Sequence, residues 1–189
     1  MTREAPCQYV PGGKRKCVLY VGSGLDCFES LVSDMERVPG AERIQAELYP
    51  VLRYGGAEIE WVPVWDTLGA TGALRSAYVN LLLIDLRWSE NFDARLQEIR
   101  GLLTELDHSE DVEQRYGFHR IVVLTSGPDS HGVDQLIVEL GSVGIRHVIR
   151  QDFSADAPAW SSDIPFGERV LRHAAELTQA RKIGKTAIC

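Results

Sequence analysis

The feature that most constrains this chain is an apolar run, Leu81-Leu82-Leu83-Ile84, that leads directly to one carboxylate, Asp85. A run that is apolar on both faces is typical of a central strand in a parallel sheet with helices on both sides. In open α/β sheets, ligands and chemistry gather at the carboxyl ends of such strands. The sequence therefore places Asp85 at the edge of the sheet where a functional site is expected.

Other short apolar runs predict further strands, which alternate with helical patterns along the chain. These strands are expected at 17–21, 57–65, 121–124 and 145–149. Alternation of strands and helices favours βαβ units, and hence a parallel sheet with right-handed crossovers. Because Glu58, Glu60 and Pro63 suit an edge strand, the second strand is placed at the edge. We predict a flavodoxin-like three-layer α/β sandwich with five parallel strands in the order 2-1-3-4-5.

Helices are predicted where apolar residues recur every three or four positions. Gly55-Gly56 is interpreted as the end of the second of them, which Pro50 breaks or kinks. Ser162 or Asp163 could cap the last helix. The expected helical segments are 28–35, 44–51, 67–77, 92–106, 133–140 and 165–181.

Length and charge indicate one globular domain without a nucleic-acid-binding face. The chain has 189 residues and a formal net charge of -7, so no broad basic surface is implied. We expect a flexible arm at 1–15, an α/β domain at 16–182 and a tail at 183–189 that resembles the start of another domain. No apolar stretch approaches the roughly 20 residues of a membrane span. With no signal peptide at the N-terminus, we predict a cytoplasmic protein.

The four cysteines, Cys7, Cys17, Cys27 and Cys189, have no C-x-x-C pairing and match no zinc pattern. We therefore expect Cys17 and Cys27 to be thiols in a reducing compartment. No metal ligand set is predicted.

Three segments together resemble the response-regulator receiver (CheY-like) family, over roughly residues 16–180. Residues 82–87 look like the segment that ends in the phosphoaccepting aspartate, which would be Asp85. Residues 121–126 look like the strand that ends in the switch Thr or Ser, here Thr125 and Ser126. Residues 144–153 look like the fifth strand and its loop. The resemblance implies a signal-transduction module of bacterial type.

The chain departs from that family at the charges its chemistry needs. A receiver carries two adjacent acids after its first strand to hold magnesium, but Gly22-Ser23 stands there. A receiver also carries a lysine after its fifth strand, and the alignment puts Gln151 at that place. Phosphoryl transfer to a carboxylate depends on a metal ion and cations already in position. We therefore expect a degenerate receiver, or pseudo-receiver, that is not an enzyme and holds no cofactor.

Four residues are weaker candidates for a pocket beside Asp85. Asp26 lies in the turn after the first strand, and Arg150 could replace the charge of the lysine with a different geometry. Trp88 is a candidate cover for the pocket, and the fourth residue is Ser23. The turn Gly22-Ser23-Gly24 also resembles part of a dinucleotide fingerprint, but Cys27 stands at the third glycine position, which favours a tight turn.

The predicted function is regulation of a protein partner or a fused domain, without membrane or nucleic-acid binding. The helices 133–140 and 165–181 are the expected contact face, also for a homodimer. One alternative is a true phosphoaccepting receiver that uses Asp85, with Asp26 or Asp66 as an unusual magnesium ligand. Another is an accessory domain of a lipolytic hydrolase, because residues 182–189 are faintly similar to the opening strand of patatin-like phospholipases.

Overall fold

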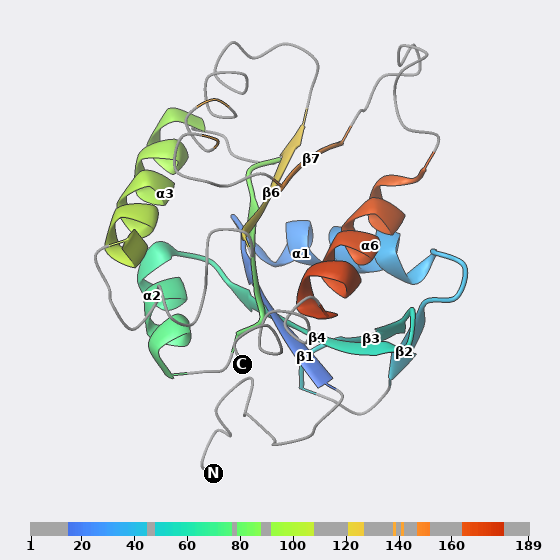
Figure 1. Ribbon diagram of the computed structural model, residues 1–189. Coiled ribbons are helices and arrows are strands. Elements are labelled where there is room, and N and C mark those ends of the chain that lie inside the picture. Colours follow the sequence, from blue (N-terminus) through green and yellow to red (C-terminus); the bar gives the residue numbers. More distant parts are fainter. Residues whose placement is uncertain are drawn as a thin grey trace, which may run out of the picture.

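The computed structural model describes residues 15–44, 48–76, 79–87, 92–107, 121–126, 138, 141, 147–151 and 164–179. Their core is one seven-stranded sheet in the order β2-β3-β4-β1-β5-β6-β7 (Figure 1). The strands are β1 Arg15–Val21, β2 Glu42–Ile44, β3 Val51–Tyr54, β4 Ala57–Val64, β5 Leu81–Asp85, β6 Ile121–Ser126 and β7 His147–Gln151. The helices are α1 Leu25–Glu36, α2 Thr67–Ser76, α3 Phe92–Asp107 and α6 Phe166–Gln179.

The predicted α/β class is confirmed, and five of the strands form the parallel core that the sequence predicts. Within that core the order is β4-β1-β5-β6-β7, with every neighbouring pair parallel. This corresponds to the predicted order 2-1-3-4-5. The strand count is different, because β2 and β3 extend the sheet beyond β4 as antiparallel strands. The expected edge strand, β4, is therefore an interior strand.

The predicted helix at 44–51 is wrong at its described residues, because Ile44 ends β2, Val51 begins β3 and residues 48–50 are not helical. Gly55 and Gly56 have φ values of 56° and 78°, a backbone conformation that favours glycine. They form the two-residue turn of a hairpin in which Tyr54 pairs with Ala57. Paired positive φ values are typical of the tight turns that join antiparallel strands. The two glycines therefore form the turn that precedes β4, and they do not end a helix.

The polar residues that suggested an edge strand are accommodated in two ways. Arg53 on β3 lies opposite Glu58 and donates to its carboxylate at 2.9 Å, which is a favourable cross-strand pair. Pro63 lies in the part of β4 beyond the residues that β3 pairs with, which are 57–60. The missing N–H of Pro63 is therefore tolerated inside an otherwise central strand.

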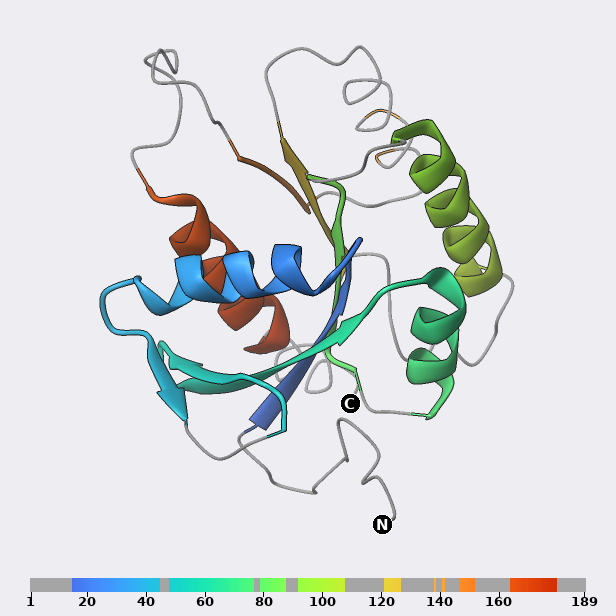
Figure 2. The same ribbon diagram turned by 180° about the vertical axis from the view of Figure 1, so that it is seen from behind.

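Helices cover both faces of the sheet, as Figures 1 and 2 show, with α2 and α3 on one face and α1 and α6 on the other. The central strand β5 contributes to both cores: Leu82 and Ile84 pack with α2 and α3, and Leu81 and Leu83 with α1 and α6. This alternation is what the fully apolar run before Asp85 predicted. On the second face, α6 approaches α1 so closely that a Cβ at Gly167 would meet the backbone of Asp34.

Several further expectations have clear outcomes. Helices near 28–35, 67–77, 92–106 and 165–181 are confirmed by α1, α2, α3 and α6. The arm before residue 15, most of the helix 133–140, the caps Ser162 and Asp163 and the tail lie outside the described residues. Among the helices that are described, none is long and apolar enough to cross a membrane.

The cysteine expectation is half right. Cys27 is a free, half-buried thiol, but Cys17 is disulfide-bonded. Disulfides persist mainly in oxidising environments, so Cys17 does not support the reducing compartment predicted from the sequence.

Candidate functional site

Asp85 ends β5 at the carboxyl edge of the parallel sheet, as the sequence predicted. It is paired in register with Leu124 of β6, and the N–H of Leu86 donates to the carbonyl of Leu124 at 2.9 Å. The side chain of Asp85 is only 1% exposed. A carboxylate buried this deeply requires partners for its charge, and the structure supplies two of them.

The first partner is Arg87, two residues after Asp85. Its Nε donates to Oδ1 of Asp85 at 2.9 Å, and its Nη2 donates to Oδ2 at 2.8 Å. Its backbone N–H also donates to Oδ1, at 3.0 Å. The guanidinium therefore binds the carboxylate with both arms of its fork, which is the geometry in which an arginine holds a carboxylate most strongly.

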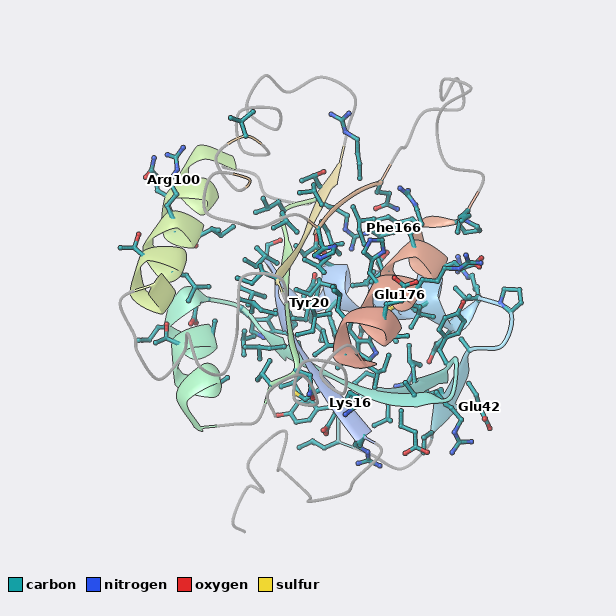
Figure 3. The ribbon with its side chains drawn as sticks, viewed as in Figure 1. Lys16, Tyr20, Glu42, Arg100, Phe166 and Glu176 are labelled. Atoms are coloured by element: carbon teal, nitrogen blue, oxygen red, sulfur yellow. The ribbon has the colours of Figure 1, made fainter. Side chains whose placement is uncertain are left out.

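The second partner is Tyr20 of β1, the strand beside β5. Its hydroxyl donates to Oδ2 of Asp85 at 2.7 Å, and the residue is completely buried. Burial raises the pKa of Tyr20 far above its usual range, and the charge and hydrogen bond of Asp85 raise it further. Tyr20 is therefore a neutral, permanent donor. Figure 3 shows it near the centre of the sheet.

Arg87 also connects Asp85 to β7, the edge strand of the parallel core. Its Nη1 donates to Oε1 of Gln151 on β7 at 2.6 Å, and its Cζ lies 4.7 Å from the ring centre of Phe166. Phe166 is the first residue of α6 and is labelled in Figure 3. Burial alone would lower the pKa of Arg87, but its hydrogen bonds with Asp85 and the charge of that carboxylate raise it. The arginine therefore stays charged.

Together these contacts occupy the Asp85 carboxylate. Its two oxygens accept four hydrogen bonds, one from Tyr20 and three from Arg87. An ionised carboxylate offers about four lone-pair sites. The arrangement is a closed, charge-neutral network, which we call the Asp85 network: Tyr20, Asp85, Arg87 and Gln151.

Tyr20 also restricts which residue fits at Gly22, the first of the two positions where a receiver would carry an acid. A Cβ built on Gly22 would overlap the Tyr20 ring, so an acidic residue at this position is incompatible with the observed ring position. Ser23 and Asp26, two of the predicted pocket residues, are exposed rather than gathered around Asp85. The carboxyl end of β1 therefore supplies Asp85 with a phenol instead of a neighbouring acid.

Thr125, the predicted switch residue, lies on the other face of the sheet from Asp85. Leu124, which pairs with Asp85, belongs to the core beneath α1 and α6, whereas Val123 belongs to the core beneath α2 and α3. Successive side chains alternate between faces, so Thr125 shares the face of Val123. Its hydroxyl is buried and has no partner among the described residues.

The same alternation corrects the expectation for Arg150. Thr125 pairs with Arg150, and Ser126 pairs with Gln151, so Arg150 points to the face away from Asp85. Gln151 is the β7 residue that reaches the Asp85 network. The side chain of Ser126 and all of Trp88 lie outside what the structure describes.

The acids proposed as unusual magnesium ligands have other positions. Asp66 Oδ1 accepts the backbone N–H of Gly69 at 2.5 Å, at the start of α2, and Asp26 is in the exposed first turn of α1. Within the described residues, no three His, Cys, Asp or Glu side chains form a group that could hold a metal ion.

Sequence reasoning missed Tyr20, Arg87 and Phe166 as parts of this site. A signal for Arg87 was available, because residues at i and i+2 of an extended segment lie on the same face, so Asp85 and Arg87 could pair. Nothing local marks Tyr20, which looks like an ordinary apolar strand residue.

No family model and no curated protein match this sequence. Solved structures do resemble it. The G domain of FeoB from Methanococcus jannaschii matches with a TM-score of 0.53 at 10% identity, covering 88% of this chain and 99% of that one. The signal receiver domain of an HD domain-containing protein from Pseudomonas fluorescens Pf-5 has a TM-score of 0.47 at 15% identity, covering 89% and 98%. NtrX from Brucella abortus has 0.49 at 13%, covering 92% and 30%.

At such low identities the likeness concerns the fold alone, and it agrees with a single mixed α/β sheet flanked by helices. A phosphate-binding P-loop would require the pattern Gly-x-x-x-x-Gly-Lys-Ser/Thr after a strand. Counted from Gly22, Cys27 stands at the second glycine and Phe28 at the lysine. The turn after β1 is therefore not a P-loop.

Proposed function

We propose that this chain is a pseudo-receiver: a receiver-like regulatory module in signalling that does not accept a phosphoryl group and acts through a protein partner or a fused domain. The proposal combines the sequence resemblance with the strand order of the parallel core. The observation that carries it is the closed Asp85 network, in which Arg87 and Tyr20 occupy both oxygens of the buried acceptor-position carboxylate.

The network opposes phosphorylation at its first step. A carboxylate can attack a phosphoryl donor only with an oxygen that has a free lone pair, and a cation must balance the incoming charge. In Asp85 both oxygens are engaged, and the cation Arg87 is bound to the carboxylate itself. Removing one partner from a buried ion pair typically costs about 3–5 kcal/mol, so opening the site would oppose transfer.

The surrounding substitutions support the same conclusion. Gly22-Ser23 supplies no acid for a metal ion, and Gln151 supplies a neutral amide where a receiver has a lysine. Gln151 instead accepts a hydrogen bond from Arg87. A hydrogen bond from the charged Arg87 to the neutral amide of Gln151 on β7 thus takes the place of the contact that a phosphoryl group and a lysine would make.

A phosphodonor assay tests the proposal. The protein is incubated with acetyl phosphate and Mg²⁺, beside a phosphorylation-competent receiver as positive control, and both are analysed by intact-mass spectrometry. We expect the adduct on the control only. A stoichiometric phosphoryl adduct on this chain that disappears in Asp85→Asn would show that it is a phosphoaccepting receiver.

The alternatives lack a specific supporting observation. A phosphoaccepting receiver would need Asp26 or Asp66 beside Asp85, but Asp66 accepts a helix N–H and Asp26 is exposed. The hydrolase alternative rests on the tail after residue 182, which the structure does not describe.

A further inference from the structure

Two exposed apolar residues, Leu25 and Trp65, lie where β1 and β4 end and the next segments begin. Leu25 is 53% exposed and Trp65 is 40% exposed. We call these two residues the apolar patch. Single exposed apolar side chains are normal on protein surfaces, whereas contiguous exposed apolar surface is typical of interaction sites.

The fold brings the patch together from two segments that are distant in sequence. The N–H of Gly22 donates to the carbonyl of Val64 at 3.1 Å, which joins the loop after β1 to the end of β4. The Trp65 ring packs edge-on against Phe28, with centroids 6.3 Å apart. Leu25 lies one helical turn before Phe28 on α1, and so on the same side of that helix.

Although Trp65 is partly exposed, its ring packs against buried aromatic residues. Its ring is 6.5 Å from that of Tyr20, and Tyr20 and Phe28 are 5.0 Å apart. The buried members of this aromatic cluster hold the tryptophan in place. A rigid, half-exposed tryptophan is the type of residue that most often dominates binding energy at protein interfaces.

The two segments that carry the patch contain acidic residues and no basic ones. The segments 22–29 and 64–69, which contain the patch and the turns beside it, include Asp26, Glu29 and Asp66 and no Lys or Arg. All three carboxylates are exposed. Because the chain as a whole has a net charge of -7, the field at this surface attracts a basic partner.

We propose that the apolar patch docks a protein segment whose apolar side chains are flanked by Lys or Arg residues. This inference rests on the proposed function as a regulatory module and names the chemistry of its partner. A second copy of this chain fits poorly, because a twofold interface would bring the same acidic rim against itself.

The test uses a synthetic amphipathic helix with leucines at positions i, i+3, i+4 and i+7 and lysines on both flanks. Binding to the full chain is measured by isothermal titration calorimetry. Leu25→Ser should weaken binding about tenfold. Leu48→Ser is the matched control, because Leu48 is 80% exposed but lies outside the apolar patch, between β2 and β3. It should leave affinity unchanged.

A second pair of variants tests the rim. Asp26→Asn with Glu29→Gln should weaken binding and reduce its salt dependence, whereas Glu176→Gln on the exposed side of α6 should not. Equal effects of Leu25→Ser and Leu48→Ser would overturn the proposal. So would equal binding of a peptide with glutamates in place of the lysines.

Sedimentation equilibrium tests whether a second copy of this chain, instead of a basic segment of another protein, occupies the apolar patch. A dimer of the wild-type chain that Leu25→Ser dissociates would assign the patch to a second copy and overturn the proposal. A phosphoryl adduct on Asp85 would instead contradict the pseudo-receiver function, and it would leave these binding measurements unaffected.

Discussion

The guanidinium of Arg87 binds both oxygens of Asp85, at 2.9 Å and 2.8 Å, in an ion pair whose two side chains are 0% and 1% exposed. Arg87, which follows the end of β5, thereby engages both oxygens of the carboxylate. The ion pair thus has a structural role: it satisfies the charge at the end of β5 and extends to β7 through Gln151.

The first prediction concerns the loss of Arg87. Arg87→Gln should lower the free energy of unfolding by about 3–5 kcal/mol, because Asp85 then remains buried without its cation. Replacing both partners by apolar residues, Asp85→Leu with Arg87→Met, should restore much of that stability. Urea denaturation measures both. The control is Arg172→Gln, which breaks the solvent-exposed pair of Arg172 with Glu168 and should have little effect. Equal effects of Arg87→Gln and Arg172→Gln would contradict the assigned role.

The second prediction concerns the pH dependence that Tyr20 contributes. Tyr20→Phe should cost about 1.5–3 kcal/mol near neutral pH, because it removes a hydrogen bond to a charged group. The pKa of Tyr20 is raised in the folded protein, whereas in the unfolded chain a tyrosine ionises at about pH 10. Above that pH the unfolded state loses the proton and the folded state keeps it, so this stabilisation declines as pH rises.

Denaturation of wild type and Tyr20→Phe at pH values from about 8 to 11 measures this difference across the unfolded pKa. The stability gap between the two proteins should be constant at the lower values and should narrow at the higher ones. A gap that widens with pH would mean that Tyr20 is ionised more easily in the folded protein.

The third prediction compares two glycines in one turn. Gly22→Ala should destabilise the protein by about 1–3 kcal/mol, because the new methyl group overlaps the Tyr20 ring. Gly24→Ala is the matched control, because a Cβ there has nothing within 4 Å. In a Tyr20→Leu background the cost of Gly22→Ala should shrink, which a double-mutant cycle by thermal denaturation detects. Additive effects in that cycle would show that the ring is not the obstacle.

The fourth prediction compares two helical glycines with opposite outcomes. Gly72→Ala in α2 should stabilise the protein by up to about 1 kcal/mol, because alanine has the higher helix propensity and the site is open. Gly167→Ala in α6 should destabilise it by about 1–3 kcal/mol through overpacking, because its Cβ would meet the carbonyl of Asp34 at 2.5 Å. Chemical denaturation of the two variants tests the sign. Stabilisation by both would mean that α1 and α6 can separate without cost.

The sequence allowed the parallel core to be predicted because the signals for it are local. The apolar run 81–84 required burial on both faces, and the alternation of strands with helical patterns implied the crossovers. The added antiparallel strands β2 and β3 were missed because Ile44, Leu48 and Val51 match a helical spacing equally well. What distinguishes a strand from a helix here is Gly55 and Gly56, whose positive φ values form the turn that joins β3 to β4.

The candidate site shows the same division. The sequence by itself determined that Asp85 ends a central strand. It also determined that no acid stands at Gly22-Ser23 and that Gln151 stands where a receiver has a lysine. Only the tertiary structure decided what Asp85 contacts. Tyr20 lies 65 residues before Asp85, and Gln151 lies 64 residues after Arg87. Such contacts depend on which strands are neighbours, in which register, and on which face each side chain emerges. Those properties belong to the assembled sheet, because no local pattern specifies the pairing of distant strands.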